Sequence, residues 1–147
     1  MSLVFFTDRD LGNTFPDILA AGGLTVERHR DHFRPDCPDD EWLRVIGERG
    51  WVAITHDSAI RYKPNELAAV VRHEVTLLVV VGKAQHAELA HNFVATVPRI
   101  TAFLARHRPP LIAKVHRPPP TNLLRHPRKA GSISLWYSQP PSRSPQM

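Results

Sequence analysis

Aspartates in this 147-residue chain follow its short apolar stretches, at the points where buried strands would end: Asp8, Asp10, Asp31 and Asp57. A fifth aspartate, Asp39, opens a segment with helical periodicity. Carboxylates gathered at one place repel each other unless a cation lies between them. Oxygen ligands of this kind suit Mg²⁺ or Mn²⁺, and an ion held in this way can activate water and stabilise the charge on a phosphodiester. These residues therefore predict a metal-dependent site, provided that the fold brings them together.

Three of these five aspartates also have an ordinary structural role. Asp8 would cap a helix beginning near Leu11, Asp39 is suited to the N-cap of the helix that it opens, and Asp57 is suited to a turn. The nine histidines lack metalloprotease spacing and are expected at the surface. A single cysteine, Cys37, excludes an internal disulfide and a multi-cysteine zinc site. Only the joint placement of the aspartates favours a cation site.

The elements that must position these residues alternate along the chain. Strands are predicted at residues 3–6, 24–29, 51–55, 75–81 and 110–115, the last at a sheet edge, and helices at 11–23, 39–50, 64–72 and 84–107, the last bent or split at Pro98. This alternation predicts an α/β fold with a mostly parallel central sheet and helices on both faces. The carboxyl ends of parallel strands share one edge of a sheet, so the aspartates should meet there.

The chain divides into a folded domain at residues 1–117 and a basic tail rich in Pro, Arg and Ser at residues 118–147. Nine of the 14 prolines lie between residues 109 and 145, a composition that predicts a flexible segment. Within it, the sequence ISLWYS at residues 133–138 is interpreted as a loose apolar patch, with a short strand or a docking motif as the alternatives.

Charge is distributed unevenly. Residues 1–88 hold 14 acidic and 10 basic side chains, whereas residues 89–147 hold 9 basic and no acidic ones. A basic rear half indicates an anionic partner such as nucleic acid, the alternative being a solvated tail that binds nothing specific. Arg61, Lys63 and Arg72 follow Asp57 and could hold phosphates, or could simply line a solvated helix face. The chain has no apolar run of membrane-spanning length and begins without a basic signal-like region, so a cytoplasmic location is expected.

The stretches FFTDRDLG and RDHF…DDEWL…ERGWVAITHDSAI resemble the PIN-like ribonuclease domains, including the VapC-like toxins of type II toxin–antitoxin pairs. That family has an aspartate after the first strand, matched by Asp8. It has an aspartate at a helix start before an apolar pair, matched by Asp39. It also has a T-x-D motif after the next strand, matched by Thr55 and Asp57. The resemblance covers about residues 3 to 115, and the order and spacing of the motifs carry it.

The resemblance implies a three-layer α/β/α fold and a metal-dependent endoribonuclease. Asp8, Asp39 and Asp57 would be its catalytic residues and would bind Mg²⁺ or Mn²⁺, with Asp10, Asp31 or Glu41 replacing the glutamate that commonly completes the site. Basic side chains would hold the RNA, a cognate antitoxin would cover the site, and a homodimer is compatible with the family.

Two alternatives stay open. Many members of the family carry a second acid two residues after the T-x-D aspartate, where this chain has Ala59. A catalytically inactive PIN-like scaffold that binds RNA or protein is therefore one alternative. The other is a phosphoacceptor domain of the receiver type, which also places acids after its first strand and an aspartate after its third.

Overall fold

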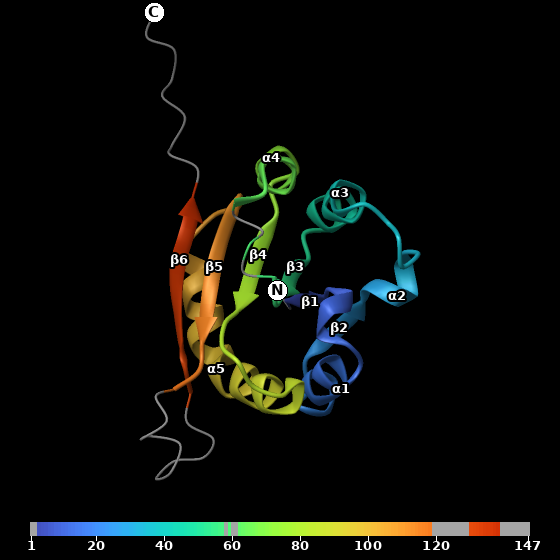
Figure 1. Ribbon diagram of the computed structural model, residues 1–147. Coiled ribbons are helices and arrows are strands. Elements are labelled where there is room, and N and C mark those ends of the chain that lie inside the picture. The colour runs from blue at the N-terminus through green and yellow to red at the C-terminus, as the bar shows by residue number, and fades with distance from the viewer. Residues whose placement is uncertain (1–2, 58, 60–61, 119–129, 139–147) are drawn as a thin grey trace, which may run out of the picture.

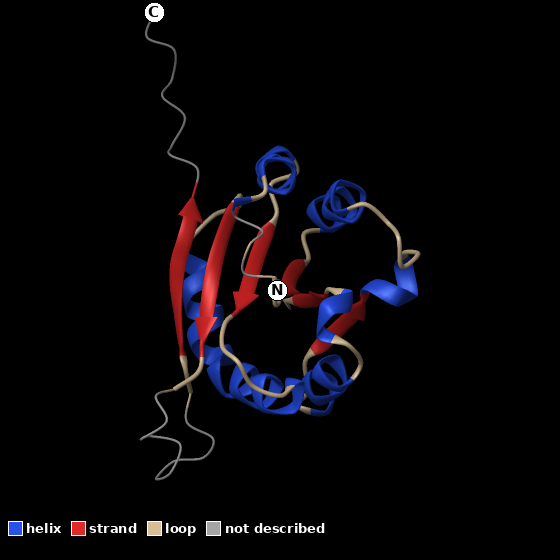
Figure 2. Cartoon of the chain, viewed as in Figure 1, coloured by secondary structure: helices blue, strands red, loops and turns tan. Residues whose placement is uncertain are grey.

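The computed structural model describes residues 3–57, 59, 62–118 and 130–138. Its strands are β1 (Val4–Thr7), β2 (Thr25–Arg28), β3 (Val52–Thr55), β4 (Thr76–Val80), β5 (Leu111–His116) and β6 (Ser132–Ser138). Its helices are the 3-10 helix η1 (Arg9–Leu11), α1 (Thr14–Ala21), α2 (His29–His32), α3 (Asp39–Arg49), α4 (Pro64–Arg72) and α5 (His86–Arg106). Figure 2 shows the alternation of strands and helices that the sequence predicts.

One six-stranded sheet runs through the molecule in the order β2-β1-β3-β4-β5-β6. The first five strands are parallel, and β6 is antiparallel to β5. The chain moves outward from β1 in both directions, to β2 on one side and to β3 on the other. The carboxyl ends of β1 and β3 therefore flank a topological switch point, which is where open α/β sheets bind their ligands.

Helices cover both faces of the sheet, so the predicted three-layer α/β/α architecture is confirmed (Figure 1). Alternate residues of each strand point to opposite faces. Phe5 and Ile54 pack on one face with Phe15 of α1 and Phe93 of α5. This periodicity explains why the strands that the sequence shows as continuous apolar runs are buried on two sides.

The opposite face packs against α3 and α4. Phe6 and Ala53 lie there with Trp42 of α3 and Val70 of α4, and all four side chains are at most 1% exposed. The two helices approach each other closely at Gly47 of α3, where an added Cβ atom would lie 2.1 Å from the backbone oxygen of His73. Only glycine fits at this crossing without displacing the backbone.

The prediction for the ISLWYS segment as a loose patch is wrong, because these residues belong to β6. This strand hydrogen-bonds along β5 in antiparallel register, from Leu111 opposite Ser138 to His116 opposite Ser132, with an irregularity beside Ile112. As a result β5 is not the edge strand that the sequence predicts. Residues 119–129 and 139–147 of the predicted tail lie outside the described part of the chain.

Helix α5 is one continuous helix in spite of Pro98, so the predicted split is wrong. Figure 1 shows the helix curving along its length instead. Near this point Thr96 donates its hydroxyl hydrogen to the Asn92 carbonyl oxygen at 2.6 Å and accepts a hydrogen bond from the Gly131 amide at 2.9 Å. Within the described residues, no helix has both the length and the apolar character that a membrane crossing requires.

Candidate active site

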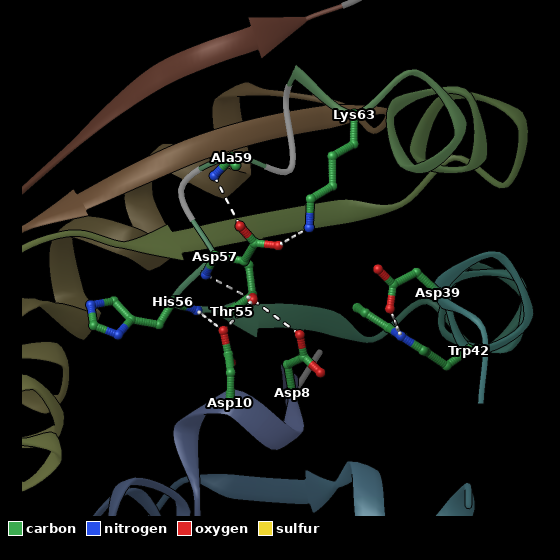
Figure 3. A network of polar contacts seen from close by, with 9 residues as sticks. All are labelled: Asp8, Asp10, Asp39, Trp42, Thr55, His56, Asp57, Ala59 and Lys63. Carbon is green, nitrogen blue, oxygen red and sulfur yellow. Dashed lines mark hydrogen bonds and ion pairs between the residues drawn. The ribbon is translucent and has the colours of Figure 1, made fainter. Parts of the chain in front are cut away.

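The polar residues of the site follow β1 and β3, the two strands at the switch point. The backbone amide of Asp8 continues the pairing of the strands by donating to the Ile54 carbonyl oxygen at 2.9 Å. The side chains of Asp8 and Asp10 then reach the last residue of β3, Thr55, which is fully buried (Figure 3). A polar side chain at the end of a buried strand is thus the centre of this cluster.

Asp8 makes two different hydrogen bonds with its two carboxylate oxygens. Oδ1 accepts from the Arg9 amide at 2.8 Å and caps η1, while Oδ2 accepts from the Thr55 hydroxyl at 3.0 Å. The predicted capping role and a role in the cluster are therefore both present in one side chain. The cap fixes the direction of the carboxylate, which leaves its second oxygen pointing at the carboxyl end of β3.

Asp10, the middle residue of η1, contacts the same hydroxyl. Its Oδ2 accepts from the Thr55 hydroxyl at 3.1 Å and from the His56 amide at 3.1 Å. Two carboxylate oxygens that share one hydroxyl oxygen lie within about 6 Å of each other. A threonine hydroxyl has a single hydrogen, so it can donate to only one of the two carboxylates at a time.

This crowding changes the acidity of both groups. Burial raises the pKa of Asp8 from 3.8 to about 6, and the neighbouring charge of Asp10 adds to the effect. The hydrogen bonds from Arg9 and Thr55 lower the pKa of Asp8, and the charge of Asp39 raises it further. Burial likewise raises the pKa of Asp10, against the hydrogen bonds that it accepts from His56 and Thr55. A cation placed between the two carboxylates would remove this penalty.

Asp57 is held differently, because its carboxylate turns toward the loop that follows β3 (Figure 3). Oδ1 accepts from the Ala59 amide at 3.0 Å, and Oδ2 forms an ion pair with Lys63 Nζ at 2.6 Å. The Asp57 amide donates to the Thr55 hydroxyl oxygen at 3.2 Å, which ties the loop to the cluster. The hydrogen bond to Asp57 raises the pKa of Lys63. The turn role expected for Asp57 is present, and Lys63 supplies the positive charge at its carboxylate.

Asp39 lies on the other side of the cluster, at the first position of α3. The N-cap of this helix is Pro38, so the expected N-cap role of Asp39 is wrong. Its Oδ1 accepts instead from the indole Nε1 of Trp42 at 2.8 Å. The charge of Asp39 acts on the pKa of both Asp8 and His29, so the carboxylate lies on the same edge of the sheet as the cluster.

The other predicted residues are not drawn into the cluster by any described contact. Asp31 is 60% exposed and has Arg30 at 3.9 Å as a partner. Arg72 forms an ion pair with Asp40 at 3.4 Å, on the outside of α3 and α4. Arg61 lies outside the described residues. Of the two predicted phosphate-binding residues that the structure describes, Lys63 therefore lies nearer to the acidic edge.

Two residues of this region are not among the predicted catalytic, metal-binding or RNA-binding residues. Thr55 stands in the T-x-D motif, and the signal that could have identified it is a hydroxyl in an otherwise apolar buried strand. His29 contradicts the expectation of surface histidines, because it is 2% exposed and its Nε2 finds no hydrogen-bond partner among the described residues. Burial lowers the pKa of His29, with a further contribution from Arg9. Its ring packs against Phe6 and Trp42, which explains its burial.

Two of the carboxylates, those of Asp8 and Asp10, are suitable ligands for a hard divalent ion. Among the residues that the structure describes, no group of three or more His, Cys, Asp or Glu side chains is placed to hold a metal ion. Mg²⁺ is usually held by one or two carboxylates together with waters, however, and Asp8 and Asp10 supply two that converge. A ligand role for Asp39 and Asp57 stays a prediction, since Trp42 and Lys63 engage their carboxylates.

A family model described as PIN like domain matches residues 3–82, which is more than half of the chain. The matched stretch runs from β1 through β4 and contains the whole cluster around Thr55 together with Asp39 and Asp57. No curated protein and no solved structure matches the chain.

Proposed function

Because this chain belongs to the PIN-like domain family, we propose that it is a metal-dependent endoribonuclease that cuts RNA at the edge where Asp8 and Asp10 meet. The observation that carries the proposal is the sharing of one buried hydroxyl, that of Thr55, by these two carboxylates at the switch point of the sheet. Such a pair is costly in the absence of a cation, which is the signature of a site built to bind one.

In this proposal Asp8 and Asp10 hold Mg²⁺ or Mn²⁺, and the bound ion lowers the pKa of water and stabilises the charge on the phosphodiester. The cap of η1 orients Asp8, and the His56 amide orients Asp10. Asp39 and Asp57 flank the pair and add negative charge to the edge.

Lys63 is the side chain best placed to hold an RNA phosphate beside the ion. Its side chain is 44% exposed, so it is accessible to a phosphate in solution. The ion pair with Asp57 fixes the position of its ammonium group. We also propose that Arg72 at the end of α4, and Arg61 two residues before Lys63 in the sequence, hold phosphates further along the RNA. The basic composition of residues 89–147 supports a polyanionic partner as well.

The proposal extends to a role as the toxin of a cytoplasmic toxin–antitoxin pair. An antitoxin would then cover the edge at Asp8 and Asp10 and inhibit cleavage, and the protein would act as a monomer or a homodimer. Co-expression with the product of a neighbouring gene, followed by purification of the pair and a cleavage assay, tests this role.

Incubation of the purified chain with labelled single-stranded RNA and Mn²⁺ tests the nuclease proposal. We expect cleavage that EDTA abolishes and that Asp8→Asn and Asp10→Asn reduce to background. Asp31→Asn is the matched control, because this exposed carboxylate lies outside the cluster, and it should cleave at the parental rate. The proposal is contradicted if the RNA stays intact in the presence of the parental protein over a range of Mn²⁺ and Mg²⁺ concentrations.

A catalytically inactive scaffold is the second candidate. It is favoured by the bonds of Asp39 to Trp42 and of Asp57 to Lys63, which engage two of the three predicted ligands. Titration of Mn²⁺ by calorimetry separates the two candidates, because an enzyme must bind the ion through Asp8 and a scaffold need not. The family match lends no support to the receiver-type alternative.

A further inference from the structure

The sheet face formed by β5 and β6 carries a group of side chains outside the site at Asp8 and Asp10. In Figure 1 these two strands stand in front of α5, and among the described residues no helix lies over the side that faces the viewer. Lys114 and His116 of β5 point to this side, since they alternate with Ala113 and Val115, which pack in the core on the α5 side. In the described part of the chain no helix therefore covers this face of the two strands, although Trp136 and Tyr137 of β6 pack against the core cluster of α3 and α4.

The side chains on this open face are aromatic and basic. Lys114 Nζ lies 4.2 Å from the centre of the Trp136 ring, which is a cation–π contact. The ring of Tyr62 meets Trp136 edge-on at 5.7 Å, and Tyr62 is 71% exposed. His116 Nε2 bonds to the Ser134 hydroxyl at 3.1 Å beside them. We refer to Tyr62, Lys114 and Trp136 as the aromatic platform.

Charge indicates the kind of partner that fits this platform. Both strands belong to residues 89–147, which contain 9 basic and no acidic side chains, so an anionic partner is favoured. An exposed ring supported by a second ring and a cation binds the flat face of an unpaired base, while the cation attracts the backbone. Bases inside a duplex are stacked on each other and cannot reach such a ring.

The platform also lies close to the acidic edge. Tyr62 belongs to the loop between β3 and α4 that carries Asp57 and Lys63. Lys114 pairs in register with Val79, and Val79 pairs with Thr55. Lys114 is thus two strands from Thr55, a separation of about 10 Å. One strand of nucleic acid can reach both places.

We propose that the aromatic platform on β5 and β6 binds unpaired nucleotides of an RNA strand, with a base stacked on Tyr62 and a phosphate near Lys114. Trp136 is a positioning residue that holds Tyr62 and Lys114 together. The inference rests on the proposed nuclease function, because the platform would guide the substrate toward Asp8 and Asp10.

Fluorescence anisotropy with a short labelled oligouridylate, measured on the full chain in EDTA, tests the proposal without cleavage. Tyr62→Ala should bind at least about fivefold more weakly, whereas Tyr62→Phe should bind as the parent does because it keeps the ring. Lys114→Gln should lower the slope of log affinity against log salt by about 0.7, and Tyr62→Ala should leave that slope unchanged. Leu135→Ala is the matched control, since this 45% exposed side chain alternates with Ser134 and Trp136 and so points to the other face of β6.

Three outcomes overturn the inference: a parent that does not bind the oligouridylate, a Tyr62→Ala variant that binds as well as the parent, or a Trp136→Leu variant that turns a dimeric parent into a monomer without weakening RNA binding. The last outcome would make the platform an interface between two copies of the chain. Cleavage in Mn²⁺ is measured separately. If RNA binding depends on Tyr62 but the RNA is not cleaved, the aromatic platform is supported and the nuclease proposal is contradicted. If the RNA is cleaved but its binding does not depend on Tyr62, the nuclease proposal is supported and the platform is contradicted.

Discussion

The Asp8→Asn substitution should make the metal-free protein more stable at neutral pH. In the folded protein burial and the charge of Asp10 raise the pKa of Asp8 to about 6, against an ordinary value of 3.8. Above pH 6 folding therefore keeps a charged group in an environment that disfavours the charge. Asparagine keeps the shape and the N-cap, donates to the Thr55 oxygen, and leaves the hydroxyl hydrogen for Asp10.

The magnitude follows from the shift in the pKa of Asp8. Between pH 4 and pH 6 the folded state binds more protons than the unfolded state, so this group makes stability fall as pH rises through that window. At 1.36 kcal/mol per pKa unit, the raised pKa of Asp8 lowers the free energy of unfolding by about 3 kcal/mol at pH 7 and by much less near pH 4. For a chain of this length we expect Asp8→Asn to melt roughly 6–12 °C above the parent at pH 7.5 in EDTA.

Thermal melting of both proteins from pH 4 to pH 7.5, in EDTA and again in Mn²⁺, measures this effect. The difference in melting temperature should shrink as the pH falls from 6 to 4, and Mn²⁺ should stabilise the parent but not the variant. Asp31→Asn should follow the parent throughout, because solvent already stabilises its exposed charge. An Asp8→Asn protein that melts below the parent at pH 7.5, or a difference that does not depend on pH, would refute the reasoning.

Three further changes test other parts of the structure. Thr55→Val removes the buried hydroxyl that the carboxylates of Asp8 and Asp10 share and should cost about 1–3 kcal/mol in urea unfolding, whereas Thr55→Ser should cost less. Asp57→Asn keeps the turn and loses only a partly exposed ion pair with Lys63, so its metal-free stability should fall by less than about 1 kcal/mol. Retained cleavage by this variant would limit Asp57 to a positioning role, and lost cleavage would make it a ligand. Gly47→Ala should destabilise the fold by about 1–3 kcal/mol in spite of the better helix propensity of alanine, because the new Cβ would overlap the His73 carbonyl oxygen. An unchanged urea midpoint for this last variant would contradict the close crossing of α3 and α4.

The sequence by itself determined the order of the five parallel strands and the longer helices, and the edge at which the candidate site lies. Apolar runs such as residues 75–81 and helical segments such as residues 64–72 carry local periodic patterns, and β4 and α4 form where those patterns predict them. Parallel strands place their carboxyl ends together, so the aspartates that follow β1 and β3 had to share an edge.

Only the tertiary structure decided which polar groups face each other along that edge. The convergence of Asp8 and Asp10 on Thr55, and the turn of Asp57 toward Lys63, depend on side-chain directions set by η1 and by the loop after β3. These contacts join residues as far as 47 positions apart, and no local pattern records them.

The same reason explains β6. Its residues have no stable strand structure of their own and gain it from the free edge of β5, across a proline-rich segment that the sequence shows as a linker. Composition therefore predicted a loose patch, whereas backbone hydrogen bonding to a distant strand produced an ordered one. The open aromatic face, which needs β5, β6 and the loop before α4 together, exists only because that pairing forms.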